Sequence, residues 1–223
     1  MSLITLKNVK KEYGKNQVLF ENLSLEIEKG EFVGFVGKSG AGKTTLLNII
    51  GLITDISEGT ITIDGHQNLS MNGKNAMILR RYTIGYLFQN YGLIEDESVL
   101  WNLKLALEYK KIKREEKLKL INKYLKQFEL SDMLNKKVYQ LSGGEQQRIA
   151  IIKLILQGSQ IILADEPTSG LDKENELIVM KLLKELNEKG ITIIMVTHNM
   201  NLCDCFSRVI NVENFRETMK KSL

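Results

Sequence analysis

One eight-residue motif constrains this chain more than any other feature of its sequence. Residues 37–44 read Gly-Lys-Ser-Gly-Ala-Gly-Lys-Thr and satisfy the pattern G-x-x-x-x-G-K-[ST]. An apolar run over 32–36 leads into the motif, and an apolar helical pattern follows it over 43–50. In a strand, glycine-rich turn and helix of this order, backbone N–H groups point at phosphate oxygens and the helix N-terminus adds positive potential. The motif therefore predicts a nucleoside triphosphate site.

Each residue type in the motif has a task in phosphate binding. We expect Lys43 to reach the β- and γ-phosphates and the Thr44 hydroxyl to bind Mg²⁺. A glycine-rich turn without a ligand is the alternative, but such a turn has no use for Lys-Thr at this offset. The residues expected to bind ATP here are Gly37, Lys38, Ser39, Gly40, Ala41, Gly42, Lys43, Thr44 and Thr45.

The rest of the chain alternates strand and helix patterns, which predicts an α/β fold. Continuous apolar runs, typical of a parallel sheet covered on both faces, occur at 32–37, 84–88, 161–164 and 191–196. Helical patterns occur at 43–50, 114–128, 145–156 and 174–188. The segments 3–9 and 23–27 alternate, which favours an antiparallel sheet laid against the core.

The stretch 89–157 is mostly helical and poor in strands, and we interpret it as an inserted lobe. The expected organisation is one unit, 1–223, whose core and β subdomain comprise 1–88 and 158–223. At 223 residues, the length suits one core with an added lobe.

Two adjacent carboxylates, Asp165 and Glu166, end the apolar run 161–164. Charges at the end of a buried strand are costly without a cation or partner. Because alternate strand residues face opposite ways, we assign the metal to Asp165 and the general-base role to Glu166. Alone, this pair would more often be a solvated strand end; the phosphate motif favours the catalytic interpretation.

A second phosphate half-site is predicted where residues 141–148 read Leu-Ser-Gly-Gly-Glu-Gln-Gln-Arg. Ser142 and Glu145 have the spacing of a capping box, which explains those two positions structurally. It does not explain Gly143 and Gly144, because glycine is unfavourable in a helix unless something approaches its backbone closely. We expect Ser142, Gly143 and Gly144 to bind an anion, facing the first half-site within one chain or across a dimer.

Charge is unevenly distributed along the chain. Thirty-one Lys and Arg against 27 Asp and Glu give a net charge of +4, yet 110–126 alone carries eight basic and two acidic residues. This segment is either a solvated helix face or a surface near anionic lipid or an acidic partner. Cys203 and Cys205 lie too close in sequence for an ordinary disulfide, and we expect reduced thiols.

No uncharged apolar stretch approaches the roughly 18 residues of a membrane span, and residues 1–5 lack the character of a signal peptide. We therefore expect a cytoplasmic protein.

The ordered set of motifs resembles the ATP-binding subunit of ABC transporters, over residues 2–212. Beyond the Walker A motif (37–44), the Walker B strand (161–166) and the signature (141–148), Gln89 is similar to the family's Q-loop glutamine. Asp172, in Ser-Gly-Leu-Asp, is similar to the D-loop residue, and His198, after Thr197, to the switch histidine. Tyr13 stands where relatives stack an aromatic ring on adenine; alone it would be a turn residue.

This resemblance implies a RecA-like P-loop core and two chains stacked head to tail around two ATP molecules. It implies that Gln89 senses Mg²⁺ and the attacking water and links the helical lobe to an integral membrane permease. Asp172 would couple the two sites, and His198 would contact the γ-phosphate. The chain would then work at the inner face of the cell membrane, with no nucleic-acid partner.

Three segments, 88–94, 97–103 and 163–168, are similar to the branch of macrolide, lipoprotein and bacteriocin exporters, with bacteriocin exporters nearest. The resemblance therefore implies export of a peptide, bacteriocin or similar amphiphile. Two other functions stay open. One is a force-transmitting or signalling ATPase that moves no cargo across the membrane. The other is a soluble ATPase acting on nucleic acid or ribosomes, whose usual coiled-coil insertion or tandem repeat is not seen here.

Overall fold

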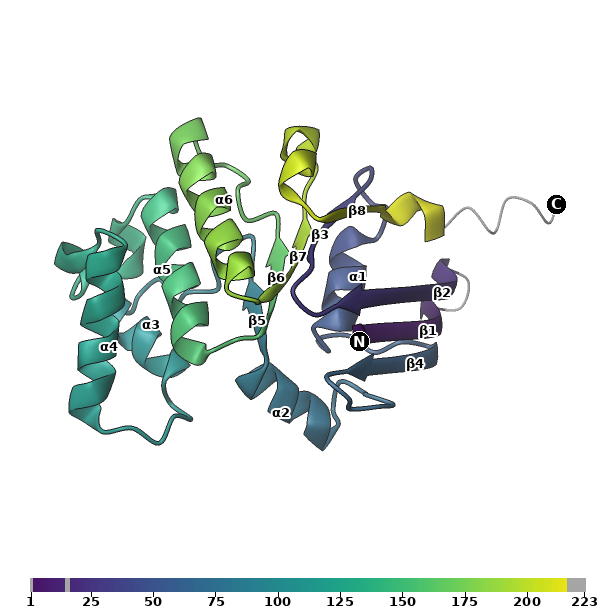
Figure 1. The fold of residues 1–223 in the computed structure, drawn as a ribbon, viewed down its shortest axis with the longest axis horizontal. Coiled ribbons are helices and arrows are strands. Elements are labelled where there is room, and N and C mark those ends of the chain that lie inside the picture. The colour runs from purple at the N-terminus through teal and green to yellow at the C-terminus, as the bar shows by residue number, and fades with distance from the viewer. Residues whose placement is uncertain (1, 15–16, 216–223) are drawn as a thin grey trace.

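A computed structural model describes residues 2–14 and 17–215 and places them in two sheets flanked by helices (Figure 1). The larger sheet is parallel, with the strand order β5-β6-β7-β3-β8. Its strands are β3 (Phe32–Val36), β5 (Ile84–Leu87), β6 (Ile161–Asp165), β7 (Thr192–Val196) and β8 (Arg208–Asn211). Strands β3, β5, β6 and β7 match the predicted apolar runs. Strand β8 was not predicted, because it is mostly exposed and its sequence has no continuous apolar run.

Both faces of the parallel sheet are buried, as the continuous apolar runs predict. Along β6, Ile161 and Leu163 belong to one hydrophobic cluster, and Ile162 and Ala164 belong to another. The first cluster contains α1 (Lys43–Ile50) and the smaller sheet; the second contains the remaining large helices. Alternate side chains of each strand thus hold two different layers together.

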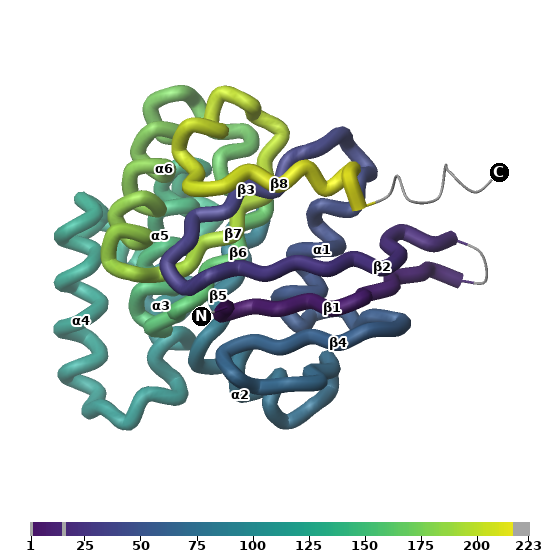
Figure 2. Tube along the Cα trace, turned by 45° about the vertical axis from the view of Figure 1, so that its right-hand side comes forward, coloured from purple at the N-terminus to yellow at the C-terminus, as the bar shows by residue number. Residues whose placement is uncertain are grey.

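The smaller sheet is antiparallel, with the order β2-β1-β4 (Figure 2). Its strands β1 (Ser2–Tyr13) and β2 (Gln17–Glu28) extend well beyond the predicted segments. The third strand, β4 (Glu58–Ile63), pairs with β1 although α1 lies between them in sequence. Sequence analysis missed β4, because long-range pairing with β1 rather than local pattern holds it in the sheet.

The second face of the parallel sheet is covered by α3 (Val99–Ala106), α4 (Arg114–Gln127), α5 (Gly143–Gln157) and α6 (Lys173–Glu188). Helix α2 (Lys74–Tyr82) instead buries Ala76 and Leu79 in the first cluster, with α1 and the smaller sheet. Helices α3, α4 and α5 come between β5 and β6 in sequence, contact one another and lie far from the antiparallel sheet (Figure 1). The predicted helices occur within two residues of their predicted bounds. Helix α2 was missed, and α3 was not predicted as a separate helix, although it lies in the stretch 89–157 that was expected to be mostly helical.

These elements confirm the predicted fold class, an α/β fold with a parallel core, an N-terminal antiparallel sheet and a helical insert. Among the described residues, none of the helices combines the length and apolar character needed to cross a bilayer.

The close approach of β4 to β1 generates a test of the small sheet. Gly59 has a φ of 96°, and a methyl group there would overlap backbone atoms of Lys7, Asn8 and Val9. Gly65 has a φ of 77° with open space around it, so it carries the same backbone strain without the clash. We expect Gly65→Ala to cost ~1 kcal/mol of unfolding free energy and Gly59→Ala roughly 2 kcal/mol more, measured by urea denaturation. Equal losses in the two variants would contradict this account of β4.

Candidate functional site

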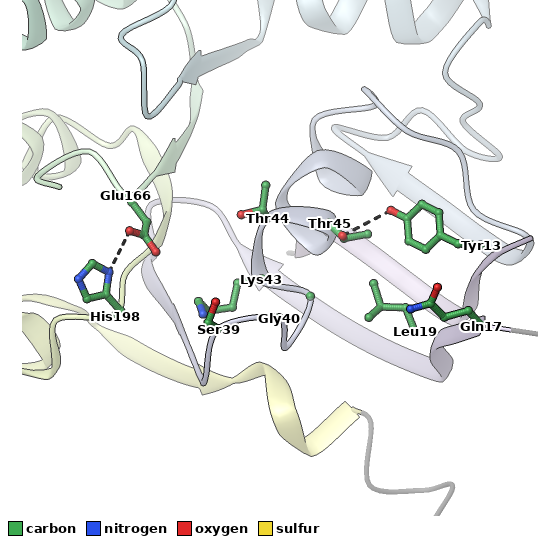
Figure 3. Close-up of a pocket in the computed structure, with 11 residues that line it drawn as sticks. Tyr13, Gln17, Leu19, Ser39, Gly40, Lys43, Thr44, Thr45, Glu166 and His198 are labelled. Atoms are coloured by element: carbon green, nitrogen blue, oxygen red, sulfur yellow. Dashed lines mark hydrogen bonds and ion pairs between the residues drawn. The ribbon is translucent and has the colours of Figure 1, made fainter. Parts of the chain in front are cut away.

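Three neighbouring parallel strands, β6, β7 and β3, end at the same edge of the core sheet. The loop 37–42 follows β3, Glu166 follows β6, and Thr197 and His198 follow β7. Together with residues of β1 and β2 they surround a cavity of about 590 Å³ (Figure 3). Its lining residues are Tyr13, Gln17, Leu19, Ser39, Gly40, Gly42, Lys43, Thr44, Thr45, Glu166 and His198. A cavity at the carboxyl ends of parallel strands is the expected place for a ligand in an open α/β sheet.

The loop 37–42 is bent around the side chain of Lys43. Its ammonium donates to the carbonyl oxygens of Gly37 at 2.7 Å and Lys38 at 2.9 Å, and the residue is 7% exposed. Gly42 precedes α1 in the left-handed region, with a φ of 97°. The outer side of the loop is held by Glu213, whose Oε1 accepts from the backbone N–H of Lys38 at 2.6 Å. A buried ammonium with carbonyl partners alone is chemically suited to gain an anionic ligand such as a phosphate.

Thr44 and Asp165 form an oxygen pair suited to a magnesium ion. The Thr44 hydroxyl donates to Oδ1 of Asp165 at 3.1 Å. Burial raises the pKa of Asp165, and the neighbouring Glu166 carboxylate raises it further, while Thr44 and Lys43 oppose the shift. Lys43 and Thr44 offset this shift only in part, and a bound cation would stabilise the ionised carboxylate further. Hard oxygen ligands, a carboxylate and a hydroxyl, fit Mg²⁺, which usually keeps several waters.

The direction of the Glu166 side chain has a different cause from the expected alternation along a strand. Glu166 lies just beyond β6 with a φ of 47°, so a turn of the chain, rather than strand alternation, directs its side chain. Its backbone N–H donates to the carbonyl oxygen of Val196 at 3.1 Å, and its Oε2 lies 2.9 Å from Nδ1 of His198 (Figure 3). Glu166 is thereby fixed at the cavity, with its side chain 24% exposed.

Tyr13 lies at the other end of the cavity, where its hydroxyl is 3.5 Å from Oγ1 of Thr45 (Figure 3). Its ring is 46% exposed and therefore open to stacking. Gln17 and Leu19 of β2 line the same end, and sequence analysis missed both. They carry no motif; only the pairing of β2 with β1, which sets Gln17 opposite Tyr13, brings them there.

The predicted second half-site lies at the start of α5, outside the cavity. Ser142 and Glu145 form the predicted capping box, with the Ser142 N–H donating to Glu145 Oε2 at 2.7 Å and the Glu145 N–H to Ser142 Oγ at 3.3 Å. A methyl group on Gly144 would overlap the carboxamide of Asn175, and one on Gly143 would crowd the Tyr91 hydroxyl. The close approach inferred for these glycines therefore has partners within the chain.

Asp172 and Gln89 also stand apart from the cavity lining. Asp172 caps α6: the pKa of its carboxyl lies below the usual value because the Asn175 backbone N–H, and then the Asn175 carboxamide, donate to it. Gln89 follows β5 and is exposed. The structure thus gathers Glu166, His198, Tyr13 and most of the predicted phosphate-binding residues around one cavity. The predicted site residues outside its lining are Gly37, Lys38, Ala41, Gln89, Ser142, Gly143, Gly144, Asp165 and Asp172, and Gly144 is buried.

The thiols play no part in this arrangement. Cys203 is half-buried, Cys205 is exposed, and both are free cysteines. Within the described ranges, no group of three or more His, Cys, Asp or Glu side chains is placed to hold a metal ion.

Comparison with known proteins places these motifs in a family. The family model described as ABC transporter matches residues 20–169. An uncharacterized ABC transporter ATP-binding protein of Methanocaldococcus jannaschii is 41% identical, over 95% of this chain and 96% of its own length. The macrolide export ATP-binding/permease protein MacB of Campylobacter jejuni is also 41% identical, over 95% of this chain. The chain spans 33% of the length of that MacB protein.

Solved structures agree with the sequence relatives. The dimeric, post-hydrolysis structure of the ATP-binding cassette MJ0796, bound to ADP and Pi, is 39% identical, with a TM-score of 0.85 over 93% of each chain. A second dimeric structure of the same cassette has a TM-score of 0.84 to this chain. The chain therefore belongs to the ABC transporter family, as an ABC ATPase.

Proposed function

We propose that two copies of this chain bind two Mg-ATP molecules between them and hydrolyse them to drive a separate membrane permease. The observation that carries the proposal is the separation of the two phosphate half-sites. The cavity holds Lys43 and Glu166, whereas the N-terminus of α5 lies outside it. A second copy, related by a two-fold axis, would add its Ser142, Gly143 and Gly144 to the cavity of the first. The dimeric MJ0796 cassette supports this assembly.

Within this proposal, each cavity residue has a chemical role. Bound Mg-ATP supplies the phosphoryl group that is transferred to water. Lys43 binds the β- and γ-phosphates, Thr44 and Asp165 hold the metal, and the loop N–H groups orient the phosphates. Tyr13 stacks on the adenine.

Glu166 and His198 act on the nucleophile. The Glu166 carboxylate accepts a proton from the attacking water, whose oxygen bonds to the γ-phosphorus as the bond to the leaving ADP oxygen breaks. His198 lies 2.9 Å from the carboxylate, so it holds Glu166 in place and also reaches toward the γ-phosphate. Gln89 would join the site from the surface, as a contact to the metal and the water.

A groove beside the edge strand β5 suits the permease. This cavity of about 430 Å³ is lined mainly by apolar and aromatic side chains of β5, the segment after it and α5. Arg80 of α2 and Lys153 of α5 also line it. Burial lowers the pKa of Lys153, whose ammonium donates to the Gly92 carbonyl oxygen at 2.8 Å. The groove lies between the proposed core, 1–88 and 158–223, and the proposed helical lobe, 89–157, so movement of the lobe would reach the permease.

The work cycle follows from these contacts. ATP draws the two copies together, and loss of the γ-phosphate removes its charge-assisted hydrogen bonds to residues 142–144, each worth on the order of 1.5–3 kcal/mol. The chain would act as a peripheral protein on the inner face of the membrane. We propose a peptide, bacteriocin or similar amphiphile as the exported cargo, from the similarity of residues 88–94, 97–103 and 163–168. The MacB relative compared above is named as a macrolide exporter instead.

Replacing the general base tests the catalytic assignment. Glu166→Gln should lower the rate of phosphate release by ~100-fold or more, because a positioned base contributes about that much, while ATP still binds and holds the dimer. Phosphate release and light scattering with Mg-ATP measure the two effects. Glu188→Gln, an exposed position on α6, is the matched control and should behave as wild type. Unaltered hydrolysis would remove Glu166 from its role.

Mixing two inactive variants tests whether the site is shared between chains. Lys43→Ala removes the phosphate lysine from one chain, and Ser142→Arg blocks the half-site of the other; each alone should be inactive. An equimolar mixture should recover roughly a quarter of wild-type hydrolysis, because half of the dimers carry one intact composite site of two. A chain carrying both substitutions, mixed with either variant, is the control. No recovery from variants that still dimerise would contradict the shared site.

The raised pKa of Asp165 gives a third test. The pKa of Asp165 is higher in the folded chain than in the unfolded chain, so ionisation of this carboxyl destabilises the fold. The loss of stability is complete at pH values above the folded pKa and absent at pH values below the ordinary aspartate pKa. At neutral pH without metal, Asp165→Asn should therefore raise the melting temperature, and it should abolish the extra stabilisation by Mg-ATP over ATP alone. Asp204→Asn, at an exposed position, controls for the general loss of a charge. A lower melting temperature for metal-free Asp165→Asn would contradict the role of burial.

A further inference from the structure

We propose that the segment joining α3 to α4, together with the end of α2, forms a membrane-contact surface that binds anionic lipid headgroups. We call this surface the basic edge and define it by Arg81, Tyr82, Tyr109, Lys111, Lys113 and Arg114. It goes beyond the ATPase reaction, although it rests on the proposed attachment of the chain to a membrane.

The basic edge is a fixed part of the fold. The Arg81 guanidinium carbon lies 3.8 Å from the centre of the Tyr109 ring, and the rings of Tyr82 and Tyr109 meet edge to face at 6.4 Å. Ile112 packs against the hydrophobic cluster around α3, α4 and α5. The linking segment is therefore anchored at both the tyrosine and the isoleucine, and Lys111 and Lys113, on either side of Ile112, are exposed.

These cations form no ion pair among the described residues, although Glu115 and Glu116 lie beside them in the first turn of α4, where Glu116 Oε2 accepts from the Lys113 backbone N–H at 3.2 Å. Lys111, Lys113 and Arg114 are exposed. The neighbouring Lys110 differs, because its ammonium lies close to Gly158, at the C-terminus of α5, where the helix dipole favours a cation. Helix geometry thus accounts for Lys110 but leaves the three cations after it without a structural role.

Two of these cations occupy positions that disfavour them. Lys113 is the N-cap of α4 and makes no side-chain cap hydrogen bond, and Arg114 is the first residue of the helix. N-caps are normally Ser, Thr, Asp or Asn, and the positive end of the helix dipole repels cations. Other residue types at these two positions would make α4 more stable. We therefore infer that Lys113 and Arg114 serve a function other than stabilising the fold.

The basic edge lies on the side of the molecule where the proposed permease groove opens. Gln157, which lines that groove, donates to the carbonyl oxygens of Arg80 and Arg81 at 3.1 and 3.3 Å, which ties the end of α2 to α5. Tyr82 stands just before the start of β5, whereas the nucleotide cavity lies at the carboxyl ends of the parallel strands. In Figure 1 the segment joining α3 to α4 runs below α4, on the same side as α2. A permease seated in the groove would bring this side toward the bilayer.

The chemistry of the basic edge favours lipid over an acidic protein segment. Tyr82 is 48% and Tyr109 55% exposed, and half-exposed tyrosines beside lysines are typical of the membrane interface. Lys111, Lys113 and Arg114 are exposed, and they line neither the cavity beside β5 nor the nucleotide cavity. Open, strongly hydrated lysine charges suit a plane of headgroups.

Vesicle binding by the full chain, without permease, tests the proposal. Co-sedimentation is measured with phosphatidylcholine vesicles and with vesicles containing about 30% phosphatidylglycerol, at roughly 0.05 M and 0.5 M NaCl. The wild type should bind only the anionic vesicles, and only at low salt. The triple variant Lys111→Gln, Lys113→Gln, Arg114→Gln should bind them on the order of 100-fold more weakly, because each basic residue contributes about a fivefold factor.

A matched variant controls for net charge. Lys7→Gln, Lys181→Gln, Lys184→Gln removes three exposed charges from β1 and α6, outside the basic edge, and should bind as wild type within ~2-fold. The melting temperature of the basic-edge variant should be unchanged or higher, because a cation is removed from the start of α4. Its ATPase rate should also be unchanged, which separates this proposal from the proposed function.

Three results would overturn the proposal: equal binding to neutral and anionic vesicles, binding that high salt leaves intact, or equal weakening by the two triple variants. A fourth result would assign the surface to an acidic protein partner instead. In that case the wild type would not bind anionic vesicles, and the basic-edge variant would lose only the membrane protein that co-purifies with the wild type in detergent.

Discussion

The parallel pairing of β6, β7 and β3 is the constraint on which the rest of this molecule depends. It sets the loop 37–42, Glu166 and His198 at one edge, because parallel strands that are in register end together. The pairing is stable only because both faces of the sheet are covered, one by α1 and the antiparallel sheet and the other by the large helices. The same buried side chains that stabilise the sheet thus position the groups that act on a phosphate.

The surface around this core separates three proposed sites in space. The nucleotide cavity lies at the carboxyl ends of the strands, the groove proposed for the permease lies beside β5, and the proposed basic edge lies beyond that groove. Gln157 connects the last two by its hydrogen bonds to the end of α2. Ser142 is the N-cap of α5, so this one helix extends from the proposed phosphate half-site to the groove. A displacement of its N-terminus would therefore also move the α5 residues that line the proposed permease groove.

Two consecutive glycines at a helix start, such as Gly143 and Gly144, do not by themselves indicate a ligand. Gly143 and Gly144 do permit a close approach, but the groups that approach are Asn175 and Tyr91 of the same chain. Asn175 in turn donates to Asp172, so the start of α5 and the start of α6 are fitted to each other.

The sequence by itself determined the strand-loop-helix around Lys43, the buried strands, the capping box at Ser142 and the family, because each depends on residues close together in the chain. It did not reveal β4, β8, Gln17 or Leu19, which owe their places to pairing between distant segments. The direction of Glu166 was likewise decided by a positive φ and by the Val196 carbonyl, not by strand alternation. Only tertiary structure could decide these points, because the partner that fixes each residue lies elsewhere in the chain.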